Sequence, residues 1–113
     1  MSALVPFRVV ESRDPDGVLR IALIGELDLA VADRLSARLE QLTSDGTPVR
    51  LDLSRLEFID GSGIRTLLQA MHDGSRNSER LVEVDRTIGD HVQAVIDLTG
   101  VAPTLWPTGA SVS

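Results

Sequence analysis

The sequence predicts an α/β fold, in which a sheet with parallel strand pairs packs against helices. Segments with the alternating pattern of strands take turns with segments whose apolar residues recur every three to four positions, as in amphipathic helices. Turn signals separate these segments, for example Asp14–Gly17 and Ser44–Gly46. The 113 residues, 42% of them hydrophobic, are enough for one domain with one core.

The first third of the chain predicts a hairpin followed by a helix. A weakly alternating strand over Phe7–Glu11 and a nearly continuous apolar strand over Val18–Ile24 flank the Asp14–Gly17 turn. Pro6 places the first strand at an edge of the sheet. The helix is expected over Ala30–Thr43. Its apolar stripe consists of Val31, Leu35, Leu39 and Leu42.

The middle of the chain predicts two strands and the clearest helix. The strands cover Pro48–Leu53 and Leu56–Ile59. In the helix, Ser62 is a candidate N-cap and Gly74 the stop signal. The apolar stripe of this helix is Ile64, Leu67, Leu68 and Met71.

The C-terminal third predicts a short strand over Leu81–Val84 and a helix that ends at Gly100 in a C′ position. Thr87 and Asp90 resemble a capping box at the start of this helix. A last strand is expected over Val101–Leu105. We expect the domain to span residues 5–107, with flexible termini at 1–4 and 108–113.

The composition excludes several classes of function. Eleven basic against seventeen acidic residues give a net charge of −6, which argues against nucleic acid as a partner. The chain has no cysteine, and its basic residues are all arginine, so thiol and lysine chemistry are excluded. Neither a membrane span nor a secretory signal is recognisable. We therefore expect a cytoplasmic protein without membrane contact.

Enzymatic motifs are incomplete. Gly61 and Gly63 are followed by Thr66 where a dinucleotide fingerprint needs glycine, and Asp60 stands where a nucleophile elbow needs glycine. His72 would lie about 15 Å from Ser62 along the same helix, at about 1.5 Å per residue. We expect no enzyme, no cofactor and no metal site.

The positive signal is the loop from Phe58 to Ile64. It places the Ser62 hydroxyl between two glycines, where a strand gives way to the first turn of a helix. Free N–H groups and the helix dipole favour an anion there, and a phosphoserine would change the surface charge. The other interpretation is that Ser62 only caps the helix while the glycines shape the turn.

Three segments resemble the STAS-domain family, specifically the small anti-sigma-factor antagonists of bacteria. VRLDLSRLEFIDGSGIRTLL resembles the family's phosphorylation-site segment. Gly25–Asp28 resembles the motif between its second strand and first helix, and Val95–Val101 resembles the end of its last helix. The resemblance extends from Phe7 to Trp106 and implies a single STAS-like domain. Its fold would be a mixed sheet of four to five strands with three to four packed helices.

The resemblance implies a function in transcription regulation. Such an antagonist binds an anti-sigma factor and so frees the sigma factor. The anti-sigma factor, a histidine-kinase-like ATPase, phosphorylates a serine or threonine of the antagonist, and a serine phosphatase resets it. The alternatives are a STAS scaffold that is not phosphorylated, or a domain that senses a small molecule or nucleotide.

Two departures from the family pattern affect the predicted site. The position that commonly accepts the phosphate is Gly61, so Ser62, which matches the second hydroxyl of the motif, becomes the candidate acceptor. Val31 stands where a threonine or serine is frequent, so either Asp28 or a backbone arrangement must cap the first helix. Asp28 thus has a capping and a partner-surface interpretation. Asp60 either holds the loop or supports phosphotransfer.

The partner-binding face is therefore predicted from two segments of the chain. It consists of Glu26, Leu27, Asp28, Asp60, Gly61, Ser62, Gly63, Ile64 and Arg65.

Overall fold

The structure is a computed structural model that describes residues 6–75 and 81–106. Its strands are β1 (Arg8–Arg13), β2 (Leu19–Leu27), β3 (Val49–Asp52), β4 (Leu56–Ile59) and β5 (Val82–Val84). Its helices are α1 (Leu29–Ser44), α2 (Gly61–Asp73), α3 (Asp90–Thr99) and α4 (Ala102–Leu105). The predicted flexible termini, 1–4 and 108–113, lie outside the described residues, as does most of the polar loop before β5.

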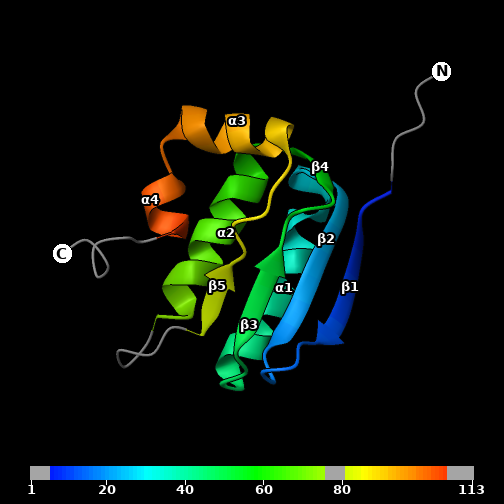
Figure 1. Cartoon of the computed structure of the whole chain (residues 1–113), viewed down its shortest axis with the longest axis vertical. Helices are drawn as coiled ribbons and strands as arrows, with labels where there is room; N and C mark the ends of the chain where they lie inside the picture. Colours follow the sequence, from blue (N-terminus) through cyan, green and yellow to red (C-terminus); the bar gives the residue numbers. More distant parts are fainter. Residues whose placement is uncertain (1–5, 76–80, 107–113) are drawn as a thin grey trace.

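The predicted mixed sheet is confirmed. Its order is β1-β2-β3-β5, with β4 paired to β2 as well. β1 runs antiparallel to β2, whereas the pairs β2–β3, β2–β4 and β3–β5 are parallel. β1 lies at an edge, as Pro6 indicated. Figure 1 shows α1 and α2 behind the sheet, α3 across one end of it and α4 beside α2.

β2 pairs first with β3 and then with β4 along its length. Residues 19–22 pair with β3, and the register then shifts between Gly25 and Glu26, where β2 pairs with β4. Gly25 has a φ of +95°, which a residue with a side chain adopts only at a cost. This glycine therefore supplies the backbone conformation at the point where the register between β2 and β4 shifts.

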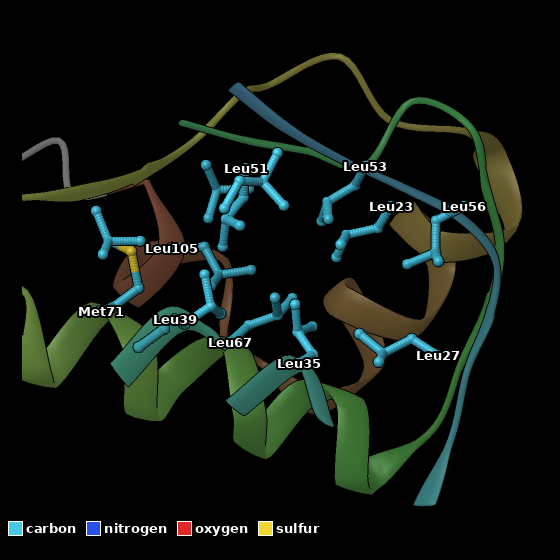
Figure 2. Packing of buried hydrophobic residues seen from close by; sticks show 14 of the residues in the cluster. Leu23, Leu27, Leu35, Leu39, Leu51, Leu53, Leu56, Leu67, Met71 and Leu105 are labelled. Carbon is cyan, nitrogen blue, oxygen red and sulfur yellow. The ribbon is translucent and has the colours of Figure 1, made fainter. Parts of the chain in front are cut away.

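The core lies between the sheet and the two long helices (Figure 2). Leu23 and Leu51 of the sheet pack in one cluster with Leu35 of α1 and Leu67 of α2, and all four are at most 1% exposed. The alternation of buried and polar residues in β3 puts Leu51 on this side and its neighbours on the other. The predicted helical stripes are thus the core faces of α1 and α2.

Three local predictions were wrong. Val101–Leu105 forms the short helix α4 instead of a strand, with proline in its first turn. The N-cap of α3 is Gly89, with no side-chain cap, so Thr87 and Asp90 do not form a capping box. Ser62 is not the cap of α2, because the helix already begins at Gly61 and Asp60 precedes it. Gly100 has φ +72° and closes α3 as predicted.

Candidate partner-binding site

The predicted site lies where two parallel strands end side by side. Leu27, the last residue of β2, pairs with Ile59, the last residue of β4, and the Asp60 N–H donates to the Leu27 carbonyl oxygen (3.2 Å). The chain enters α1 directly after β2 and α2 directly after β4. The first turns of both helices therefore lie next to each other at one end of the sheet (Figure 1).

Each helix is capped by an aspartate. Asp28 Oδ1 accepts from the Ala30 N–H and Asp60 Oδ1 accepts from the Gly63 N–H, both at 3.0 Å. Both residues have the extended backbone that is typical of an N-cap. The capping interpretation of Asp28 is thus confirmed, and so is the interpretation that Asp60 holds the loop. Both carboxylates are half-buried, so part of their surface also reaches the predicted face.

Gly63 allows the first turn of α2 to lie against the strand ends. A Cβ atom at this position would come within 2.7 Å of Ile59 Cγ1 and 2.9 Å of the Leu27 carbonyl oxygen. Gly61 differs, because a Cβ atom there would meet nothing within 4 Å. The two glycines therefore have different structural roles: close packing requires a glycine at position 63, whereas Gly61 is exposed to solvent.

Ser62 lies half-buried between the two glycines. Its hydroxyl forms no hydrogen bond to the described residues, and no buried side-chain oxygen among them lacks a partner. The hydroxyl therefore reaches solvent. The backbone carbonyl oxygen of Ser62 accepts a hydrogen bond from the Thr66 hydroxyl (3.0 Å). This bond holds Ser62 in the first turn of α2. An anion on this hydroxyl would lie at the positive end of the helix dipole.

The structure separates the nine predicted site residues into two groups. Leu27, Gly63 and Ile64 are buried, at most 6% exposed for the two apolar side chains, so they cannot offer side chains to a partner. The side chains of Leu27 and Ile64 pack beneath the face, so the contact of these three residues with a partner stays a prediction that concerns their backbone. The accessible or half-buried members are Glu26, Asp28, Asp60, Gly61, Ser62 and Arg65.

Sequence reasoning missed two exposed apolar side chains around this face. Leu29, the first residue of α1, is 70% exposed, and Phe58 of β4 is 37% exposed. The Phe58 ring stacks on the His91 ring of α3, with 6.1 Å between centroids. Leu29 is an apolar residue outside the predicted apolar stripe of this helix. That position was the one signal in the sequence that could have identified Leu29 as an exposed side chain. We define the docking face as Leu29, Phe58 and the six accessible predicted residues.

Comparison with known proteins identifies the family. The family model described as "Mlab, STAS domain" matches residues 10–105, and the chain belongs to the STAS-domain family. No curated protein sequence matches the chain. No helix in the part of the chain that the structure describes has both the length and the apolar character needed to cross a membrane.

Solved structures of anti-sigma factor antagonists are similar to the chain. One from Mycobacterium paratuberculosis has 27% identity and a TM-score of 0.76, and the match covers 94% of this chain and 88% of that one. SpoIIAA in its unphosphorylated form has 23% identity, a TM-score of 0.68 and coverage of 87% and 84%. The Bacillus cell fate determinant SpoIIAA in the phosphorylated form has 21% identity, a TM-score of 0.63 and coverage of 87% and 86%. At these lower identities the likeness to SpoIIAA concerns the fold.

Proposed function

We propose that the chain is a cytoplasmic anti-sigma factor antagonist that binds a kinase-type anti-sigma factor through the docking face and so releases a sigma factor. The observation that carries this proposal is the similarity to the Mycobacterium paratuberculosis antagonist over 94% of the chain. The proposal involves no catalysis by this chain. Its activity consists of presenting or withholding a surface.

The chemistry of the docking face favours a partner with an apolar pocket and arginines around it. Leu29 and Phe58 supply exposed apolar area to it. Glu26, Asp28 and Asp60 place three carboxylates at the ends of β2 and β4. Opposite charges at the rim of such an interface accelerate association and fix its register.

We propose further that phosphorylation of Ser62 switches this binding and that a serine phosphatase reverses it. The hydroxyl reaches solvent, and a phosphate there would add about −1.5 to −2 charge beside Asp28 and Asp60. Helix N–H groups would stabilise the phosphate without changing the fold. The solved phosphorylated form of SpoIIAA supports the view that a protein of this fold tolerates the modification.

A substitution of Ser62 tests the switch. Ser62→Asp should weaken binding to the anti-sigma factor at least about tenfold, which corresponds to about 1–3 kcal/mol for charge added to a partly buried contact. Titration calorimetry with purified histidine-kinase-like anti-sigma factors measures it. Ser12→Asp, which places the same charge on edge strand β1, should leave affinity unchanged. Equal affinities of Ser62→Asp and the wild type would remove Ser62 from the switch.

Gly61 favours a second function, a STAS scaffold that is not phosphorylated or that responds to a small molecule or nucleotide. The commonly modified position lacks a side chain here, although open space surrounds it. Intact-mass measurement after incubation with the kinase and ATP distinguishes the two. The switch predicts one phosphate on the wild type and none on Ser62→Ala. The scaffold predicts an unmodified wild type, with a phosphate acquired only by Gly61→Ser.

A further inference from the structure

A groove lies along the free edge of β5, apart from the docking face. It has a volume of about 500 Å³, within the range of about 300–1,000 Å³ that is usual for small-molecule sites. Met71 of α2, Val84 of β5 and Leu105 of α4 line it with apolar atoms, and Trp106 and Arg86 line it with an indole and a guanidinium. Figure 1 shows α4 beside α2, on the side of the molecule where β5 ends the sheet.

The Trp106 ring is held in a fixed orientation. Its indole Nε1–H donates to the Val84 carbonyl oxygen (2.8 Å), which also occupies a backbone acceptor of β5, the last strand in the sheet order. The Arg86 guanidinium carbon lies 5.8 Å from the centre of the indole ring. Attraction between the cation and the ring thus places the guanidinium over an aromatic face. Two smaller hollows, of about 220 and 230 Å³, adjoin the same pair on the side of Ala102.

Arg86 is the cation that remains available in this groove. The other arginine in the lining, Arg50, bonds to Asp14, Asp16 and Glu83. The carboxylate of Asp85 bonds to Arg20 at 3.4 Å. Among the described residues Arg86 forms no ion pair, and it is exposed. The Arg86 guanidinium therefore lies beside the apolar residues of the groove and forms no ion pair with a described carboxylate.

We propose that this groove binds a small aromatic anion, a flat apolar body with a single carboxylate, sulfonate or phosphate group. The anionic group pairs with the two parallel N–H donors of Arg86, and the flat body lies against the half-buried indole of Trp106. Met71, Val84 and Leu105 are buried and form the apolar base of the groove beneath it. A neutral apolar molecule would desolvate the guanidinium without compensation. A ligand with several phosphates would approach the carboxylates of Glu83 and Asp85, which also line the groove. This proposal is independent of the proposed function.

The groove contains its own spectroscopic probe, because Trp106 is the chain's one tryptophan and the chain has no tyrosine. The probe ligand is anilinonaphthalene sulfonate, an aromatic anion that accepts excitation energy from tryptophan. Titration should give saturable energy transfer from Trp106. Arg86→Gln should weaken binding about tenfold, the usual ratio for loss of a charge-assisted hydrogen bond. Arg86→Lys, which keeps the charge, should retain most of the affinity.

Controls separate this site from general apolar binding. Arg34→Gln removes an exposed arginine from α1, outside both the groove and the docking face, and should leave the affinity unchanged. Leu98→Ser removes the most exposed large apolar side chain and should also have no effect. The neutral analogue phenylnaphthylamine should bind more weakly and should not respond to Arg86→Gln. Unsaturable binding, equal affinity of Arg86→Gln and the wild type, or a loss in Leu98→Ser would overturn the proposal.

Discussion

At the residue scale, the contact between α2 and the two strand ends depends on Gly63. We predict that Gly63→Ala lowers the free energy of unfolding by about 1–3 kcal/mol, the usual cost of excess atoms in a packed core. The added methyl group would meet the Leu27 carbonyl oxygen at 2.9 Å, and a backbone atom of β2 cannot rotate away. Urea unfolding followed by circular dichroism measures the change.

The matched control is the neighbouring glycine of the same loop. Gly61 is not in the left-handed region, and a methyl group there would meet nothing within 4 Å. Gly61→Ala should therefore leave stability unchanged or raise it by up to about 1 kcal/mol, through the lower entropy of the unfolded chain. Similar losses in both variants would contradict the assignment of close packing to Gly63 alone.

The roles of single residues were predictable only in part. The sequence indicates Asp28 as a possible cap because Val31 stands where a threonine or serine is frequent in the family. For α2 the sequence predicts Ser62 as the cap, because Ser62 lies just before the apolar stripe. The structure uses Asp60, because β4 ends at Ile59 and the glycine-containing turn is already helical. The residue at which β4 ends thus determines which residue caps α2. The pattern of apolar and polar residues in the sequence defines the ends of elements poorly.

At the scale of elements, the two N-caps connect the strand ends to the helices. We predict that Asp60→Ala lowers the free energy of unfolding by about 1 kcal/mol, because the Gly63 N–H loses its acceptor. Asp60→Asn should retain most of that stability, since an asparagine oxygen also caps a helix. Urea unfolding of both variants measures this. A loss as large in Asp60→Asn as in Asp60→Ala would show that the charge, and not the cap, stabilises α2.

The order of elements from β1 to α3 was predictable, whereas α4 was not. Alternation and helical periodicity extend over enough residues to identify the longer elements. The segment Val101–Leu105 is too short for either period to appear. Pro103 fits the first turn of a helix, and the edge of β5 that a further strand would occupy carries the Trp106 bond to the Val84 carbonyl. The conformation of this segment thus depends on the contact between Trp106 and Val84, which are far apart in the sequence.

At the scale of the whole molecule, an ion-pair network on the sheet face opposite α1 and α2 joins the hairpin turn to three strands. Arg20 of β2 bonds to Asp14 and Asp52 at 3.0 Å each, and Arg50 of β3 bonds to Asp14 at 2.6 Å. Arg50 also reaches Glu83 of β5. The sequence contains one sign of this network, because polar residues stand at alternate positions of apolar strands. Which charges pair with each other could not be predicted, since that depends on the order of the strands in the sheet.

This network lowers the pKa of its aspartates. The hydrogen bonds from Arg20 and then Arg50 hold the pKa of Asp14 below its usual 3.8. Burial alone would raise the pKa of Asp52, but the hydrogen bonds from Ser54 and Arg20 outweigh it and lower the pKa. The backbone N–H of Thr87, and more weakly Arg20, lower the pKa of Asp85. The folded state therefore holds these carboxylates ionised at a pH where the unfolded chain takes up protons.

Acid should consequently unfold the domain through this face. Because the folded pKa values are depressed, the stability that they contribute is complete above about pH 3.8 and is lost as the pH falls through the lower folded values. We predict that the free energy of unfolding, measured by urea titration at successive pH values, falls steeply below about pH 4. Asp14→Asn removes the carboxylate that Arg20 and Arg50 share. The free energy of unfolding of this variant should be lower at neutral pH and should decline less on acidification.

The control is Asp73→Asn, on α2 outside the network, which should follow the wild-type curve. Parallel curves for all three proteins would mean that the network does not control acid stability.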